Sequence, residues 1–123
     1  MITLTEDKHT GGFLIWETLR DYTRETVTIA AGAGKLAPGT VLGRITTGGK
    51  YTVLTPGASN GSQAAAGLIW DHADATDADA PAVVILRGPA IANRHEIIFP
   101  EGMTEPQITA ATTALAAIGI ILR

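Results

Sequence analysis

The chain contains no cysteine, few aromatic residues and few charged residues. The missing cysteines exclude a disulfide scaffold, a thiolate metal site and a cysteine nucleophile. Aromatic residues occupy 5% and charged residues 17% of the 123 positions, whereas an average soluble domain has about 25% charged residues. We therefore expect thin core layers and a surface that is covered by neutral side chains or buried against a partner.

Two further absences limit the choice of partners. The formal net charge is −3, and because nucleic-acid binding needs a basic surface, we expect no nucleic-acid partner. No apolar stretch approaches the ~20 residues of a membrane helix, so we also expect no membrane partner. The opening sequence MITLTEDKH carries acidic residues where a secretory signal would be basic, which predicts synthesis in the cytoplasm without an export signal.

The hydrophobic content of 46% is enough for the modest core of one small domain. From Val27 onward, short β-like runs alternate with turns rich in glycine and proline. The expected extended segments are 27–30, 41–46, 51–54, 64–70, 82–86, 89–93, 96–99 and 120–122. The turn at 47–50 contains two glycines and predicts a hairpin. The unbroken apolar run 82–86 is typical of a strand covered on both faces.

One helix is predicted near the C-terminus. Thr104 and Gln107 have the spacing of a capping box, and Pro106 suits the first helical turn. Gly119 follows the last turn and suits a left-handed cap. The apolar stripe of this helix consists of Ile108, Ala111, Leu115 and Ile118. The chain thus reads as a β-rich α+β fold, a small single domain with one C-terminal helix.

The first 24 residues differ from the rest of the chain. Ile2 and Leu4 alternate with polar residues, Gly11 and Gly12 follow, and then an apolar run, 13–16, leads into a charged stretch. This pattern fits either an ordinary first strand or a mobile arm that becomes ordered on a partner. The paired glycines and the dense charges favour the arm. We therefore divide the chain into an N-terminal arm, 1–24, and a domain, 25–123.

The glycine-rich turns before Lys35 and Lys50 do not match a phosphate-binding loop. That loop needs a further glycine five residues before the last one, where this chain has Ile29 and Arg44. It also needs a hydroxyl residue directly after the lysine, where this chain has leucine and tyrosine. Flexible β-turns are therefore the preferred interpretation.

An acidic loop at residues 71–79 is the best candidate for a metal site. Its possible ligands are Asp71, His72, Asp74, Asp77 and Asp79. Calcium prefers several oxygen ligands from a short loop, but the calcium-loop pattern also needs a central glycine and a distal glutamate. Because the segment has alanines and then Pro81 instead, it is more typical of a solvated turn. A small metal-dependent binding or hydrolytic module built on this loop stays open as an alternative.

No constellation of catalytic residues is evident. His95 and Glu96 are adjacent, and neighbouring residues of a strand point to opposite faces, so they do not cooperate as base and orienting group. Ser59 and Ser62 lie in a turn-rich loop without a nucleophile elbow. We therefore expect no enzyme, no catalytic residue, no bound metal and no cofactor.

Several segments resemble the head decoration proteins of tailed phages, the family of the bacteriophage lambda capsid-stabilising protein. The resemblance extends in order and spacing over roughly residues 25–123. It is carried by segments 35–43, 49–51, 61–69, 87–90, 97–100 and 115–122, which read KLAPGTVLG, GKY, GSQAAAGLI, RGPA, IIFP and LAAIGIIL. These are turns and strands rather than a catalytic signature, so the ordered set is more specific than any one part.

The resemblance implies a β-rich domain with little regular structure that assembles as a homotrimer. It implies binding to the major capsid protein on the outer surface of the expanded head, at three-fold and quasi-three-fold positions, and stabilisation of the head against the pressure of packed DNA. An arm with alternating apolar residues could add a strand to a sheet edge of the capsid protein. The expected capsid-binding residues are Ile2, Leu4, Phe13, Leu14, Ile15 and Trp16. A structural subunit of a phage tail or fibre is a further alternative.

Overall fold

A computed structural model describes residues 8–123, which form ten short strands, two α-helices and one 3-10 helix. The strands are β1 Leu14–Glu17, β2 Arg24–Ile29, β3 Gly34–Leu36, β4 Val41–Arg44, β5 Tyr51–Val53, β6 Ala65–Ile69, β7 Ala73–Ala75, β8 Ala80–Ile85, β9 Ala90–Ala92 and β10 Ile120–Leu122. The helices are α1 Arg20–Thr23, η1 Arg94–Glu96 and α2 Glu105–Ala117. This is the β-rich α+β architecture that the sequence predicts.

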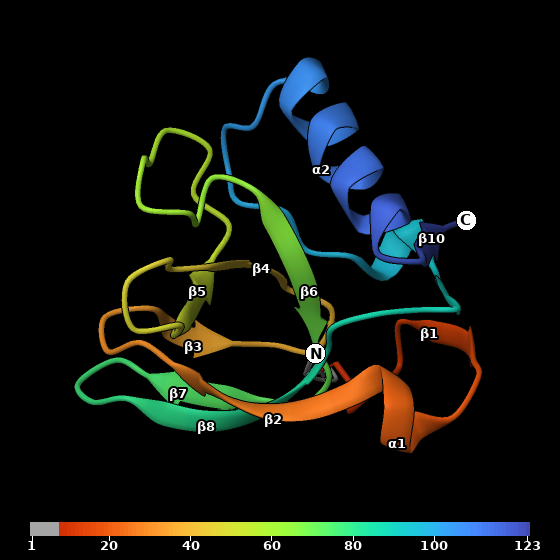
Figure 1. Ribbon diagram of the computed structural model, residues 1–123, viewed down its shortest axis with the longest axis horizontal. Helices are drawn as coiled ribbons and strands as arrows, with labels where there is room; N and C mark the ends of the chain where they lie inside the picture. The colour runs from red at the N-terminus through yellow and green to blue at the C-terminus, as the bar shows by residue number, and fades with distance from the viewer. Residues whose placement is uncertain (1–7) are drawn as a thin grey trace, which may run out of the picture.

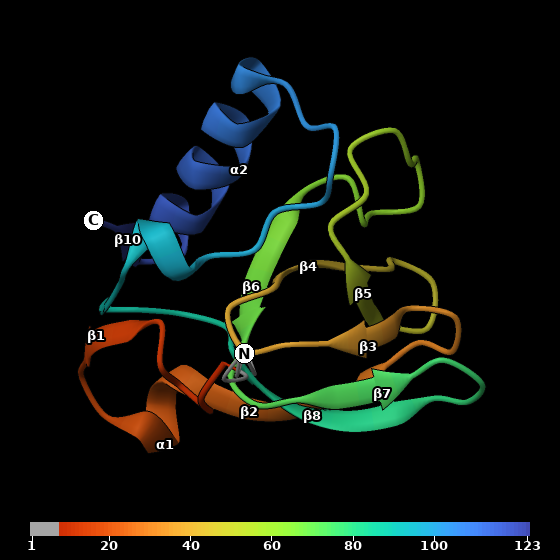
Figure 2. The same ribbon diagram turned by 180° about the vertical axis from the view of Figure 1, so that it is seen from behind.

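Five strands close into a barrel in the order β2-β5-β4-β6-β8. The predicted hairpin is confirmed, because β4 and β5 pair antiparallel with Arg44 opposite Tyr51. A separate sheet has the order β1-β9-β10, and β3 pairs with β7. Helix α2 and β10 lie together on one side of the barrel, and β3 and β7 lie away from them (Figures 1 and 2).

The barrel strands separate two apolar cores, because consecutive residues of a strand point to opposite faces. Each barrel strand sends at least one side chain into the inner core, which contains Ile29, Leu42, Tyr51, Ile69 and Val84. The outer core lies between the barrel, α2 and the three-stranded sheet, and contains Phe13, Val41, Leu68, Ile85, Leu115 and Ile120. The run 82–86 supplies both cores, which confirms the prediction of a strand covered on both faces.

Helix α2 begins and ends as its sequence predicts. The backbone N–H of Gln107 donates to Thr104 Oγ1 at 3.4 Å, and the backbone N–H of Thr104 donates to Gln107 Oε1 at 3.0 Å. Ala111 and Leu115 are buried in the outer core, and Gly119 has a φ of 88° directly after the helix. With 13 residues, α2 is the longest helix in the part of the chain described here, and none there is long and apolar enough to span a bilayer.

The structure corrects three local expectations. Strand β3 lies within a predicted glycine-rich loop and β7 within the acidic loop, and they pair with Lys35 opposite Asp74, an opposite-charge pair of the kind that stabilises antiparallel strands. The expected extended segment 96–99 begins instead in η1, because Asn93 caps this turn by accepting from the His95 N–H at 3.0 Å. Ile98 still forms a bridge, but with Thr40.

We expect Leu115→Ala to lower the free energy of unfolding by about 2–5 kcal/mol, because the lost side chain is fully buried between α2 and the barrel. The matched control is Leu19→Ala, which removes the same atoms from a side chain that is 71% exposed and should change stability by no more than about 0.5 kcal/mol. Urea denaturation of both variants checks this. Equal losses would contradict the placement of α2.

Candidate interaction surface

Large exposed apolar side chains gather on one short segment of the protein. Within residues 8–123, Ile15 is 58%, Trp16 51%, Leu19 71% and Tyr22 56% exposed, and Ile121 follows with 41%. Ile15 and Trp16 lie on β1, and the other two belong to the turn formed by α1. We call Ile15, Trp16, Leu19 and Tyr22 the β1–α1 patch. Such a cluster on a small protein is typical of an interaction site, and tryptophan and tyrosine are frequent anchors of protein interfaces.

The three-stranded sheet extends this patch across its outer face. Trp16 pairs with Ile91 of β9, and Ile91 pairs with Ile121 of β10. Paired residues of neighbouring strands project from the same face, so these three side chains form an apolar row. The opposite face of the sheet is buried against α2 through Ala90, Ala92, Ile120 and Leu122. One face of the sheet therefore belongs to the core and the other is available to a partner.

Trp70, directly after β6, holds the segment before the patch. The Phe13 and Trp70 rings meet edge to face, with centroids 6.2 Å apart. The Arg24 guanidinium carbon lies 3.5 Å from the indole centroid on a cation–π contact. The Gly11 N–H donates to the Trp70 carbonyl oxygen at 2.9 Å. These contacts, which we call the Trp70 junction, join the N-terminal segment to the barrel.

A half-buried polar network fixes the strand that carries the patch. Glu17, at the end of β1, forms an ion pair with Arg24, at the start of β2. The Arg24 Nε–H donates to Glu17 Oε2 at 3.3 Å, and the buried Thr23 hydroxyl donates to the same oxygen at 2.6 Å. Hydrogen bonds to charged groups in such surroundings are stronger than neutral ones. The network therefore closes the β1–α1 turn and presents its apolar side chains on a rigid base.

The six residues that the sequence analysis assigned to capsid binding have different positions. Ile2 and Leu4 lie outside the described residues. Phe13 is 2% exposed and belongs to the outer core, whereas Leu14 is half-buried beside it. Ile15 and Trp16 are exposed in the β1–α1 patch.

Leu19 and Tyr22 were missed by the sequence analysis, although they are the exposed apolar residues of a charged stretch. Their spacing of three residues puts them on one side of a helical turn. This spacing was the feature of the sequence that could have indicated an apolar surface there. In the structure, the segment from Phe13 to Arg24 is folded onto the barrel and the sheet. The division into an arm of residues 1–24 and a domain of residues 25–123 stays a prediction.

Three carboxylates of the acidic loop, those of Asp71, Asp74 and Asp79, bind separate partners. Asp71 Oδ1 accepts from the Thr10 hydroxyl and from the His72 N–H, both at 2.7 Å. The Thr10 hydrogen bond is the main reason that the pKa of Asp71 is lowered. Asp74 Oδ1 accepts from the Thr76 hydroxyl at 2.6 Å, and this bond likewise lowers the pKa of Asp74.

Asp79, at the other end of the loop, forms an ion pair with Lys50 at 2.6 Å, and the hydrogen bond in this pair lowers the pKa of Asp79. Its Oδ1 accepts from the Ala31 N–H at 2.8 Å. Over residues 8–123, no three histidine, aspartate or glutamate side chains lie together as a metal site would require. Asp71 and Asp79 therefore bind neighbouring segments of the protein, whereas Asp74 binds within the loop.

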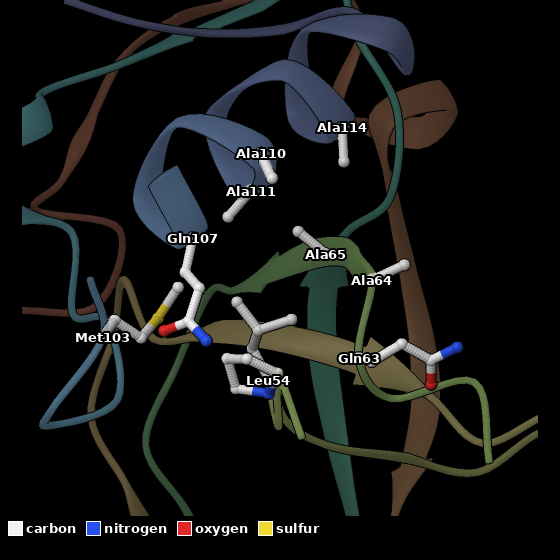
Figure 3. A pocket seen from close by; sticks show the side chains of 10 residues that line it. Leu54, Gln63, Ala64, Ala65, Met103, Gln107, Ala110, Ala111 and Ala114 are labelled. Carbon is white, nitrogen blue, oxygen red and sulfur yellow. The ribbon is translucent and has the colours of Figure 1, made fainter. Parts of the chain in front are cut away.

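A hollow of about 280 Å³ lies between α2 and the start of β6 (Figure 3). It is lined mainly by alanines and by the amides of Gln63 and Gln107. Both amide oxygens already accept backbone hydrogen bonds, from Gly61 at 2.8 Å and Thr104 at 3.0 Å. No titratable side chain lines the hollow. It offers apolar contact rather than acid–base chemistry.

Ser62 is also not available as a nucleophile. Its side chain is 1% exposed, and its hydroxyl donates to Asn60 Oδ1 at 2.6 Å. The serine therefore stabilises the turn before β6.

A comparison with protein families gives a match over nearly the whole chain. The family model described as the bacteriophage lambda head decoration protein D matches residues 3–120. The match includes the β1–α1 patch, α2 and the residues of both cores except Leu122. The comparison with curated proteins gives no match.

We expect Gly11→Ala to disrupt the Trp70 junction. Gly11 has a φ of 65°, and a Cβ atom there would lie 2.0 Å from the indole ring. The matched control is Gly32→Ala, at a φ of 91° with no atom within 4 Å of the new Cβ, so it carries the backbone strain without the clash. Gly11→Ala should lower the free energy of unfolding by about 1–3 kcal/mol more than the control does. Urea denaturation measures the difference, and equal effects would contradict the junction.

Proposed function

The chain belongs to the bacteriophage lambda head decoration protein D family, and we propose that it binds as a homotrimer to the outer surface of the expanded phage head. Its partner there is the major capsid protein, at three-fold and quasi-three-fold sites. The family match over residues 3–120 carries this proposal. A protein that binds only the expanded lattice stabilises it by mass action, and so offsets the outward pressure of the packed DNA.

The β1–α1 patch supports a role in binding. A decoration protein acts through the surface area that it covers, and this patch offers exposed Trp16 and Tyr22 side chains on a rigid base. We assign the patch to the contact with the capsid protein.

We assign the remaining docking contact to residues 1–7, which precede the described part of the chain. Ile2 and Leu4 alternate with threonines, a pattern that suits a strand added to the edge of a sheet in the capsid protein. In a trimer, three such segments bind together, because the second and third docking events are effectively intramolecular.

The proposal predicts a trimer that distinguishes between two states of the head. We expect light scattering on the purified protein to give the mass of three chains, because avidity requires three linked copies. We then expect the protein to sediment with expanded empty heads and to stay in the supernatant with unexpanded ones. A monomer that binds both forms equally would contradict the proposal. Immuno-electron microscopy that finds the protein on tails would favour a tail subunit instead.

We expect Trp16→Ala to weaken binding to expanded heads by at least about 2 kcal/mol, as is typical of a tryptophan at the centre of an interface. The control is His95→Ala, which removes another exposed ring from η1, outside the patch, and should leave binding within about 0.5 kcal/mol of the wild type. Titration of expanded heads with each variant measures both effects. Equal losses of affinity would contradict the assignment of the patch.

A further inference from the structure

Residues 8–11 are held against the domain at several points. The Lys8 ammonium group donates to the carbonyl oxygen and to the carboxylate Oε2 of Glu96, both at 3.0 Å. The His72 Nε2–H donates to the Lys8 carbonyl oxygen at 2.8 Å. Lys8 is therefore bound through both its side chain and its backbone, by two segments that lie far apart in the sequence.

The next residues continue the same attachment. The Thr10 hydroxyl donates to Asp71 Oδ1 at 2.7 Å, and the Gly11 N–H donates to the Trp70 carbonyl oxygen at 2.9 Å. The same Asp71 oxygen also accepts from the His72 N–H at 2.7 Å. A single carboxylate oxygen thus links the N-terminal segment to the loop after β6.

Asp71, His72 and Glu96, which bind Lys8 and Thr10, have no other role in the proposed binding. Asp71 and His72 belong to the acidic loop, which was a candidate metal site in the sequence. Glu96 belongs to the pair His95–Glu96, which was considered there as a base and its orienting group. Asp71 and His72 lie between β6 and β7, and Glu96 ends η1, so both sites are fixed by the fold. The Lys8 and Glu96 side chains are 36% and 48% exposed. Each exposed contact contributes little stability by itself, so the set is poorly explained by stability alone.

We propose that Asp71, His72 and Glu96 are positioning residues that fix Lys8 and Thr10, and with them the position at which residues 1–7 are joined to the domain. We call this set of contacts the N-terminal clasp. The inference rests on the proposed docking role of residues 1–7. A segment whose attachment point is already fixed loses less conformational freedom when it docks. In a trimer, the clasp would also set the spacing of the three docking segments, on which their combined affinity depends.

The experiment compares a clasp variant with a loop control in the full chain. The clasp variant is Asp71→Ala with His72→Ala, which removes the contacts to Thr10 and to the Lys8 carbonyl. The matched control is Asp77→Ala, which removes one carboxylate from the same loop. A rescue variant, Asp71→Asn with His72→Gln, keeps an acceptor and a donor at the two positions.

Two measurements separate positioning from a merely structural role. Trypsin cleaves after lysine, so release of Lys8 should speed the loss of residues 1–8. Mass spectrometry measures the rate of this cleavage. We expect faster cleavage in the clasp variant, with its urea unfolding midpoint unchanged, and wild-type rates in the control and the rescue variant. We also expect the clasp variant to bind expanded heads about tenfold more weakly than the wild type, because the docking segment is no longer held in place.

A chain that lacks residues 1–7 separates the two possible failures. This truncation keeps Lys8 and all the clasp contacts. If it binds heads as well as the wild type, both the docking role of residues 1–7 and the clasp proposal are overturned. If it loses binding while the clasp variant binds fully, the clasp alone is overturned. Unchanged cleavage after Lys8 in the clasp variant would also overturn the clasp.

Discussion

The contacts of Trp70 are the constraint that holds residues 11–24 on the barrel. Phe13 packs on one edge of this indole, and the Arg24 guanidinium lies over its ring. The Trp70 backbone carbonyl oxygen accepts from the Gly11 N–H. Because Arg24 also pairs with Glu17, the junction positions both the strand that carries the β1–α1 patch and the residues that enter the clasp. Trp70 therefore contacts both the segment that leads into the β1–α1 patch, through its ring, and the end of the clasp segment, through its backbone.

This organisation suits a protein that acts by covering area. The two cores contain most of the large aliphatic side chains. The few large apolar side chains that remain exposed lie near β1 and α1. Asp71 and Asp79 of the acidic loop bind neighbouring segments, Asp71 through a hydrogen bond from Thr10 and Asp79 through an ion pair with Lys50. The chain belongs to the head decoration family. Its polar contacts described above are made within the protein, which agrees with a structural role.

The candidate surface could be predicted only in part. The apolar run 13–16 indicates a buried or docking strand, but such a run does not reveal which residues face the core. In the structure, Phe13 is buried and Trp16 is exposed, and the register of β1 against β9 shifts between Leu14 and Trp16. That irregularity depends on the partner strand, which lies more than seventy positions later in the chain.

Features set by neighbouring residues were determined by the sequence itself: the capping box of α2, its glycine stop and the β4–β5 hairpin each depend on contacts within a few positions. Only the tertiary structure decided the closure of the barrel, the pairing of β3 with β7 and the roles of Asp71, His72 and Glu96. Those three residues bind partners 61, 64 and 88 positions away. A local pattern cannot specify such contacts, because they form only after the two cores have brought the segments together.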